Sequence, residues 1–435
     1  MDISKRARKA ANILKTTSNN DRNAALKAIH DRLRDNKDRI LDANKLDVES
    51  AKSNDLSGAL IKRLELTSTK FDVMLQGLLD VAALEDPINK VTLERELDDG
   101  LKLYKLSCPV GVLLVIFEAR PEVIAQIGSL AIKSGNAAIL KGGKESLNTF
   151  TVIQDLVSDA LSRTRIPSDA LQLITTRELV ADLLKCDEYV DMVIPRGSKE
   201  LVQNIKRSTT IPVLGHADGI CTAYIDEFAN PEMAAKIVVD SKTNYPAGCN
   251  AIETLLINKN APLAGKRTVA ALIDNGVTIY ADEPTMEFIT DAIGADQHLK
   301  LADADAFDTE FLCLAIAVKQ VNNVEEAIEH INEHGSHHTD VIVTDNEANA
   351  NKFLIGIDSA GVYWNASSRF ADGYRYGFGA EVGVSTNKLH ARGPVGLDGI
   401  MSYQYVIKGN GQVAGDYVGA GGAKRFQFKD INLTK

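Results

Sequence analysis

The run GVLLVIFEA at residues 111–119 decides the class of fold. Almost every side chain in it is apolar, as expected for a strand that is buried on both faces of a parallel sheet. A helical pattern follows over residues 120–134, and Gly135 is placed to close that helix. A buried strand followed by a helix is the repeating unit of a parallel α/β sheet, so this stretch predicts an α/β fold.

The same alternation continues toward the C-terminus. Helical patterns separate predicted strands at residues 137–140, 171–174, 190–194 and 221–225. With the first strand these make five strand–helix alternations, which predict a doubly wound parallel sheet. We expect the strand at 221–225 to close this first unit. Ligands of such sheets bind beyond the carboxyl ends of the strands.

A second alternation follows the helical pattern that begins at Asn230. Its predicted helices cover residues 262–275, 284–293, 323–333 and 347–355. They separate predicted strands at residues 252–257, 277–280, 312–318, 341–343 and 361–364. The segment has about 140 residues, which suits an open α/β domain of its own.

The N-terminal region has a different pattern from both sheets. Residues 1–90 are predicted to be helical, because apolar side chains recur at helical spacing, as from Leu26 to Leu41. Two runs at 91–97 and 101–107 then flank Asp98-Asp99-Gly100, a strong hairpin signal. Such a hairpin packs on its own domain or extends to a partner subunit, and the sequence leaves both alternatives open.

Composition excludes several classes of protein. The chain has 435 residues, of which 45% are hydrophobic, and a net charge of −10 without a long basic block, so we expect no nucleic-acid partner. The N-terminal MDISKRARKAAN has no apolar core, and the longest apolar run, Val110 to Phe117, is too short to span a bilayer. Five widely spaced cysteines without a CxxC motif predict reduced thiols and a cytoplasmic location.

The stretch TNYPAGCNAIET at residues 243–254 carries the candidate nucleophile, Cys249. A turn containing Asn244, Pro246 and Gly248 delivers this cysteine to the start of a predicted strand. Small residues before it leave room for a carbonyl to approach the sulfur, and loops on a rigid scaffold often carry chemistry. The alternative is a buried, inert thiol.

Two strand ends in the first unit suit a dinucleotide. The pair Gly197 and Ser198 permits close backbone approach and opens a helix whose free N–H groups can bind a pyrophosphate. The residues Lys141 and Lys144 flank two glycines, a good site for a ribose or a 2′-phosphate. Neither stretch matches G-x-G-x-x-G, so a plain tight turn and solvated lysines are the alternatives.

Histidines cluster in the segment VNNVEEAIEHINEHGSHHTDVI at residues 321–342. The spacing of His330 and His334 would allow both to bind a metal from one helix face. No HExxH motif or nearby third ligand accompanies them, so we expect no metal there. We expect His337 and His338, in the following loop, to hydrogen-bond an anionic substrate.

Several motifs together resemble a known superfamily. The cysteine after an Asn-x-Pro-x-Gly turn, the Gly-Ser at a helix start and the PVGV sequence at 109–112 resemble the aldehyde dehydrogenase superfamily. The stretches TNYPAGCNAIETLL, AIEHINEHGSHHTDVI and GAEVGVSTNKLHARGPVGL are more specific. They resemble the γ-glutamyl phosphate reductase family, its fungal members in particular, and the resemblance extends over essentially the whole chain.

This resemblance implies an organisation, a cofactor and partners. The cofactor would be NADPH/NADP, the substrate a small molecule, glutamyl 5-phosphate, and the assembly a homo-oligomer, with glutamate 5-kinase as a candidate partner. The implied parts are a nucleotide-binding domain at 1–228 with a hairpin oligomerisation arm at 91–107, a catalytic domain at 229–376, and a return to the first domain and the arm at 377–435.

The resemblance also assigns roles to single residues. The superfamily nucleophile falls on Cys249. The positions that contact the cofactor fall on Lys141, Gly197, Ser198 and Glu310. A preference for NADPH over NADH is inferred from Lys141 and Lys144 together with the family.

Two departures from the superfamily bear on mechanism. Hydrolytic members carry a glutamate base where this chain has Val213, and an oxyanion asparagine in a Trp-Asn-x-Pro stretch where this chain reads FEARP at 117–121. The missing base argues against activation of water. This fits an enzyme whose acyl partner is phosphate.

The implied reaction is the NADPH-dependent reduction of L-glutamyl 5-phosphate through a thioester on Cys249, the second step of proline biosynthesis. A substrate with a carboxylate and a phosphate needs cations and N–H donors. The candidates are Arg120, Asn250, His337, His338, Ser367, Arg369 and Arg392. For the arginines the alternative is a surface salt bridge. For the function it is another phosphate- or CoA-linked aldehyde dehydrogenase of this superfamily, or a scaffold protein without activity.

Overall fold

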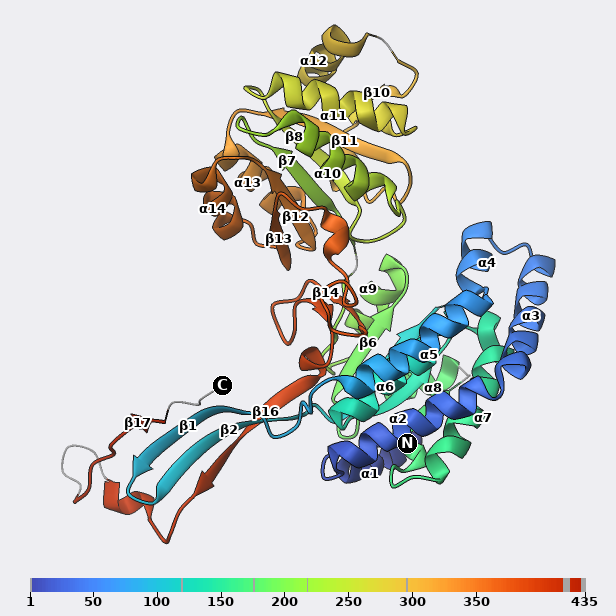
Figure 1. Cartoon of the computed structure of the whole chain (residues 1–435), viewed down its shortest axis with the longest axis vertical. Helices are drawn as coiled ribbons and strands as arrows, with labels where there is room; N and C mark the ends of the chain where they lie inside the picture. Colours follow the sequence, from blue (N-terminus) through green and yellow to red (C-terminus); the bar gives the residue numbers. More distant parts are fainter. Residues whose placement is uncertain are drawn as a thin grey trace.

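The computed structural model describes residues 2–118, 120–174, 177–216, 218–294, 296–417 and 423–431. Figure 1 shows three parts: a helix-rich α/β unit at the lower right, a second α/β unit at the top and an arm at the lower left. The predicted fold, two open parallel α/β sheets with a hairpin arm, is confirmed. The glycine-rich stretch at 419–422 and the C-terminal residues 432–435 lie outside the described residues.

The N-terminal region is helical, as predicted. Its helices are α1 (Asp2–Leu14), α2 (Asn19–Arg34), α3 (Lys37–Ser53), α4 (Gly58–Leu64) and α5 (Ser68–Ala83). Helices α2, α4 and α5 each follow a Ser or Thr whose side chain accepts a hydrogen bond from a first-turn N–H. The apolar face of α2, with Leu26, Ile29 and Leu33, is buried in the core of the first unit. None of the described helices is long and apolar enough to cross a membrane.

The first sheet has the strand order β5-β4-β3-β6, and all its pairings are parallel. Its strands are β3 (Val112–Phe117), β4 (Ala137–Lys141), β5 (Leu171–Ile174) and β6 (Met192–Arg196). Its helices are α6 (Val123–Ser134), α7 (Leu147–Ser162), α8 (Arg177–Leu183) and α9 (Lys199–Ser208). Every residue of β3 is buried, which explains its continuous apolar sequence. The αL conformation of Gly135 closes α6, as predicted.

The second sheet has seven parallel strands in the order β10-β9-β11-β8-β7-β12-β13. These are β7 (Cys221–Ile225), β8 (Ile252–Asn258), β9 (Thr278–Ala281), β10 (Leu299–Leu301), β11 (Ala315–Val321), β12 (Thr339–Val343) and β13 (Gly361–Trp364). Its helices are α10 (Pro231–Thr243), α11 (Pro262–Asp274), α12 (Glu283–Ile293), α13 (Val324–His334) and α14 (Glu347–Gly356). The short strand β10 was not predicted.

The position of β7 corrects one prediction. This strand does not close the first sheet, because it pairs with β8 and β12 in the second. A strand buried on both faces has the same apolar sequence in either sheet, so its pattern cannot tell which sheet it joins. Helix α10 returns the chain to the strand beside β7, and the two strands with α10 form one β–α–β unit.

The arm is an antiparallel sheet of order β16-β2-β1-β17. It consists of β1 (Val91–Asp98), β2 (Leu101–Pro109), β16 (Met401–Lys408) and β17 (Lys429–Asp430). The predicted hairpin is confirmed, and Gly100 at its turn has φ +69°. Figure 1 shows the arm projecting away from both α/β units. Between β13 and β16 the chain forms a small antiparallel ribbon of β14 (Gly383–Ser385) and β15 (Gly393–Val395).

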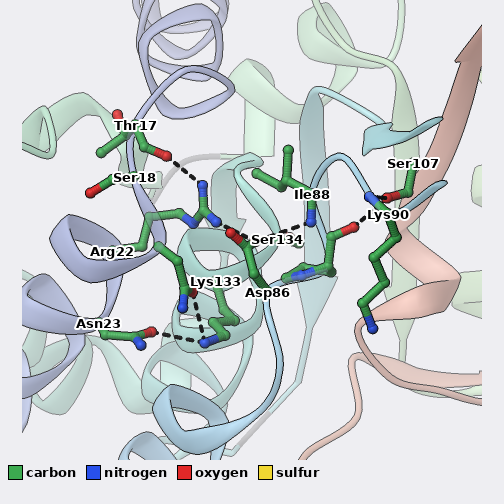
Figure 2. A network of polar contacts seen from close by, with 12 residues as sticks. Thr17, Ser18, Arg22, Asn23, Asp86, Ile88, Lys90, Ser107, Lys133 and Ser134 are labelled. Atoms are coloured by element: carbon green, nitrogen blue, oxygen red, sulfur yellow. Dashed lines mark hydrogen bonds and ion pairs between the residues drawn. The ribbon is translucent and has the colours of Figure 1, made fainter. Parts of the chain in front are cut away.

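Buried cations fasten the helical layer to the base of the arm (Figure 2). The guanidinium of Arg22, 1% exposed, donates to Thr17 O at 2.6 Å and to Asp86 Oδ1 at 2.5 Å. The same Asp86 oxygen accepts from Ile88 N, just before the hairpin. Burial without such partners would be costly, so this network holds the segment that leads into the arm.

The ammonium of Lys133 on α6 is fully buried beside this network (Figure 2). It donates to Asn19 Oδ1, Asn23 Oδ1 and Ala82 O at 2.9 to 3.0 Å, so all three of its protons have acceptors. Burial lowers the pKa of Lys133. These bonds tie α2 and α5 to the sheet-covering helix α6.

Candidate active site

A cavity of about 490 Å³ lies between the two α/β units. The first sheet contributes the carboxyl ends of β3 and β6, and the second contributes the segments that precede β8 and β11. The predicted site residues that line it are Arg120, Gly197, Ser198, Cys249, Asn250, Glu310 and Arg369. Residues from distant parts of the sequence therefore meet in one place.

The thiol of Cys249 stands on a turn between α10 and β8, as predicted. The side chain of Asn230 caps α10, and Ala251 N donates to Gly248 O at 2.9 Å to close the turn. Within the described ranges, neither the Cys249 N–H nor the Asn250 N–H donates a hydrogen bond. Both are therefore available to an oxyanion that forms beside the sulfur.

The backbone of Cys249 rests on Gly219, which leads into β7. A Cβ on Gly219 would lie 2.2 Å from Cys249 O and 2.6 Å from Cys249 Cα, so no side chain fits there. The Gly219 N–H donates to Glu310 Oε1 at 2.9 Å, and Cys221 Sγ donates to Cys249 O at 3.2 Å. These contacts fix the position of the Cys249 backbone, and with it the thiol, relative to the second sheet.

A buried ion pair joins the two ends of the Cys249 turn. The Nζ of Lys242, at the end of α10, lies 2.5 Å from Glu253 Oε2 on β8, and both side chains are 0% exposed. Burial lowers the pKa of Lys242 and raises that of Glu253, while each partner's charge opposes the shift. The other carboxylate oxygen accepts from Leu312 N at 3.2 Å. The pair thus connects the end of α10 to β8 and constrains the turn between them.

Two imidazoles accompany the thiol. One ring nitrogen of His216, one of His338 and the Sγ of Cys249 all lie within 4.8 Å of one another. The two rings meet edge to face, with centroids 5.1 Å apart. The Nδ1 of His216 is 2.9 Å from Val384 O; a carbonyl only accepts, so Nδ1 donates and Nε2 carries the lone pair of the neutral ring.

The cavity also holds cations suited to an anionic substrate. The guanidinium of Arg369 lies over the ring of Tyr245, 5.6 Å from its centroid, and its Nη1 occupies the space that a Cβ on Gly248 would need. Neither Arg120 nor Arg369 forms an ion pair with another described residue, so the salt-bridge alternative does not apply to them. Burial lowers the pKa of Arg369, with the Cys249 thiolate acting in the opposite direction.

Four of the residues predicted to bind the cofactor, Lys141, Lys144, Gly197 and Ser198, lie at the carboxyl ends of strands of the first sheet, whereas Glu310 belongs to the second unit. A Cβ on Gly197 would lie 2.7 Å from Glu118 Cδ and 2.8 Å from Leu201 Cδ2, so a side chain there would displace both of these side chains where the chain turns into α9. The Oγ of Ser198 accepts from a first-turn N–H of that helix. The strand that ends at Lys141 pairs with β3, whose last residue lines the cavity, and Lys144 follows in an exposed turn. These donors and cations fit an extended, anionic dinucleotide.

Four predicted substrate-binding residues lie outside the cavity lining: the buried His338, which contacts His216, and three others. The guanidinium of Arg392 pairs with Asp358 at 3.0 Å and lines a second cavity, so for it the salt-bridge alternative holds. The Nδ1 of His337 donates to Asp358 O at 2.7 Å. The Oγ of Ser367 accepts from Arg369 N and thereby caps the short helix that carries this arginine. We expect these three residues to act on the site through their neighbours.

Several residues of the site were not predicted. The missed residues are His216, Arg196, Gly219, Lys242, Glu253 and Glu381. The sequence feature nearest to any of them was the stretch PVLG at 212–215, where hydrolytic members carry the glutamate base; it immediately precedes His216. There Val213 forms a parallel bridge with Val193 and packs against the core, so it offers no base, as predicted.

Two α/β units with a cysteine between them define the class of the protein. The model of the aldehyde dehydrogenase family matches residues 2–275. A gamma-glutamyl phosphate reductase of Saccharomyces cerevisiae is 57% identical, with 99% of this chain and 98% of that protein covered. A probable gamma-glutamyl phosphate reductase of Schizosaccharomyces pombe is 52% identical, with 99% and 96% covered.

A solved structure agrees with these relatives. The crystal structure of gamma-glutamyl phosphate reductase from Thermotoga maritima superposes with a TM-score of 0.90 at 37% identity, covering 95% of this chain and 99% of that one. The chain belongs to the aldehyde dehydrogenase family and, within it, to the gamma-glutamyl phosphate reductases. It is therefore an oxidoreductase that uses a nicotinamide cofactor and acts on a small-molecule substrate.

Proposed function

We propose that this chain reduces L-glutamyl 5-phosphate to L-glutamate 5-semialdehyde and phosphate with NADPH, the second step of proline biosynthesis from glutamate. The observation that carries the proposal is the position of the Cys249 thiol in a cavity shared by Arg120, Arg369 and the Gly197-Ser198 helix start. A thiol nucleophile, cations for an acidic substrate and a dinucleotide-binding edge meet there.

The first step is acyl transfer to sulfur. The Cys249 thiolate attacks the γ-carbonyl carbon, a C–S bond forms, and the C–O bond breaks with its electron pair leaving on phosphate. The thiol proton passes to a ring nitrogen of His216 or His338, each of which has one within 4.8 Å of the sulfur. Phosphate is a stable anion, so its departure needs little acid help.

The second step is reduction of the thioester. NADPH, when bound, supplies a hydride to the thioester carbon. The N–H groups of Cys249 and Asn250 stabilise the oxyanion, each by about 3 kcal/mol as for other acyl-transfer sites. The oxyanion then re-forms a carbonyl, the C–S bond breaks, and the electron pair returns to Cys249. The guanidinium groups of Arg120 and Arg369 hold the phosphate until it leaves and the α-carboxylate through both steps.

The position of the cavity relative to α9 and β4 supports the residues proposed to bind the cofactor. The first turn of α9 would bind the pyrophosphate through Ser198 and its N–H groups, and Glu310 would hold the nicotinamide ribose. The ammonium groups of Lys141 and Lys144 would favour NADPH over NADH, because the 2′-phosphate adds negative charge near the end of β4.

Assembly and location are also part of the proposal. The residues Tyr403, Tyr405 and Ile407 alternate along β16 and are 53 to 60% exposed, which suits an arm that packs on another copy of the chain. Five free cysteines support a reducing, cytoplasmic location. Because the acyl phosphate is unstable, the proposal includes delivery by an associated glutamate 5-kinase.

The reverse reaction tests the function. Purified protein is mixed with glutamate semialdehyde and NADP, with and without phosphate, and the absorbance of NADPH is followed. We expect formation of NADPH only with phosphate, and loss of activity by more than about 1,000-fold in Cys249→Ser. Turnover that requires CoA, or that proceeds with water alone, would instead identify another aldehyde dehydrogenase activity. Full activity in the Cys249→Ser variant would support neither.

A further inference from the structure

The thiol and the two imidazoles of Cys249, His216 and His338 form a cluster of metal-ligating atoms. These three atoms lie within 4.8 Å of one another. In a tetrahedral zinc site, Zn–N bonds of about 2.0 Å and Zn–S bonds of about 2.3 Å place the ligand atoms roughly 3.5 Å apart. A closure of about 1 Å therefore brings the cluster to zinc-binding geometry.

Both imidazoles are already oriented as metal ligands usually are. A ligating histidine donates its other ring N–H to an oxygen, which fixes the tautomer and the ring plane. Here Nδ1 of His216 donates to Val384 O, and Nδ1 of His338 lies 2.9 Å from Thr339 Oγ1. In the neutral ring of His216 this leaves Nε2 as a lone-pair donor, and the Thr339 hydroxyl can accept from Nδ1 of His338 so that its Nε2 is one too. This outer arrangement is independent of the spacing of the three ligands.

The buried ring of His338 gives a second, independent indication of a ligand. Its side chain is 1% exposed, yet Nε2 has no hydrogen-bond partner among the described residues. A buried polar atom without a partner costs free energy, because it gives up a bond to water that nothing replaces. A metal ion at the cluster would satisfy this atom.

The charge of the cavity permits a divalent cation. Its lining carries the cations Arg63, Arg120, Arg196, Lys199 and Arg369 and the anions Glu118, Glu310, Asp372 and Glu381. These charges nearly cancel, and the thiolate adds a negative charge directly at the ion. The cavity also leaves space for water at a fourth coordination position.

We propose that Zn²⁺ binds reversibly to Cys249 Sγ and to the Nε2 atoms of His216 and His338, and that the bound ion blocks the nucleophile. Binding replaces the thiol proton with the metal and releases that proton to solvent, with no change of oxidation state. The ligands must be deprotonated, so binding weakens as the solution is acidified. The blocking of turnover, unlike the binding itself, rests on the proposed function.

The test measures metal binding and thiol protection separately from turnover. The full-length protein is titrated with ZnCl₂ against a chromophoric chelator, and alkylation of Cys249 by iodoacetamide is followed by peptide mass. We expect one Zn²⁺ per chain, at least tenfold slower alkylation with the metal, and reversal of both by EDTA. Binding should weaken at least 100-fold in Cys249→Ser and in His216→Asn.

Matched variants decide between this site and another. The His→Asn change keeps a donor near the Nδ1 position and deletes Nε2. It is made at both histidines, so that His216→Asn, on the partly exposed ring, remains informative if His338→Asn fails to fold. The controls are His334→Gln and Cys313→Ser, which lie outside the cavity lining and should bind Zn²⁺ like the wild type.

Three results would each overturn the zinc site. They are Zn²⁺ binding that survives Cys249→Ser, bound Zn²⁺ that leaves alkylation unchanged, and an absence of binding at micromolar Zn²⁺. These readouts do not depend on the substrate, so an active reductase without Zn²⁺ binding refutes this site alone. A protein that binds Zn²⁺ at these residues but reduces no acyl phosphate supports the site and refutes the proposed function.

Discussion

Replacing Lys242 by methionine should both destabilise the protein and disturb the active site. The change removes a cation that lies 2.5 Å from Glu253 with both side chains 0% exposed. It leaves a carboxylate without its partner in the interior, which costs about 3–5 kcal/mol in known buried pairs. A loss of this size is a large fraction of the stability of an ordinary domain.

The pair matters for activity because of where it lies. It joins the last residues of α10 to β8, on the two sides of the Cys249 turn, and Glu253 also accepts from Leu312 N beside the cavity. Loss of this ion pair should let the Cys249 sulfur move relative to the N–H groups of Cys249 and Asn250. We expect kcat to fall by 10-fold or more, because misplacement by about 1 Å can cost 100-fold.

The assay is urea unfolding at equilibrium, combined with steady-state kinetics. The exposed pair Arg267–Glu232, on the neighbouring helices α10 and α11, provides the control, since Arg267→Met should cost less than about 1 kcal/mol. The double variant Lys242→Met/Glu253→Leu removes both charges and should recover most of the stability. It should not recover kcat, because the link across the turn is still missing.

Three results would each refute a part of this reasoning. A Lys242→Met protein that loses less than about 1 kcal/mol would mean that Glu253 is neutralised at little cost and that the ion pair contributes almost nothing. A double variant less stable than either single variant would show that the charges themselves stabilise the site. Full activity in the double variant would separate the pair from the nucleophile.

Two further predictions concern the same unit. Gly219→Ala places a methyl group 2.2 Å from Cys249 O, so kcat should fall by at least 10-fold. The control is Gly276→Ala, at an open position between α11 and β9 with φ +74°, which should leave kcat unchanged. Equal kinetics for the two variants would contradict the role of Gly219. Burial lowers the pKa of His330 to about 3, below its unfolded value of about 6.5, so this residue contributes stability above pH 6.5 that is lost as the pH falls toward 3. Between pH 7.5 and 5.5 the wild type should lose about 1.4 kcal/mol more than His330→Phe in urea unfolding, and parallel curves would exclude this effect.

The sequence was informative where one residue pattern has one structural meaning. The wholly apolar β3 could only be a strand buried on both faces, and Asp98-Asp99-Gly100 between two alternating runs could only be a hairpin turn. The placement of Cys249 was predictable for the same reason, since a turn rich in small residues followed the end of α10. Local rules determine such elements before any tertiary contact forms.

The remainder depended on contacts between distant residues. A lysine at the end of a helix and a glutamate in a strand suggest solvated side chains, and only the packed structure shows that Lys242 and Glu253 lie together in the interior. Likewise His216 has no spacing partner in the sequence. Its ring meets His338, more than a hundred residues later, because β7 and β12 are neighbours in the second sheet. No local pattern predicts this pairing of strands.

The site draws on opposite ends of the two sheets, and this arrangement has a chemical consequence. The cofactor edge lies at the carboxyl ends of β3 and β6, as expected for parallel α/β folds, whereas the thiol lies at the amino end of β8. The rule that ligands bind at the carboxyl ends of parallel strands locates the predicted cofactor edge of the first sheet but not the thiol at the amino end of β8. An acyl carbon bound to the sulfur can lie next to a dinucleotide at the first sheet only while both units keep their mutual position. Catalysis should therefore be more sensitive than folding to changes in the segments that connect the two units.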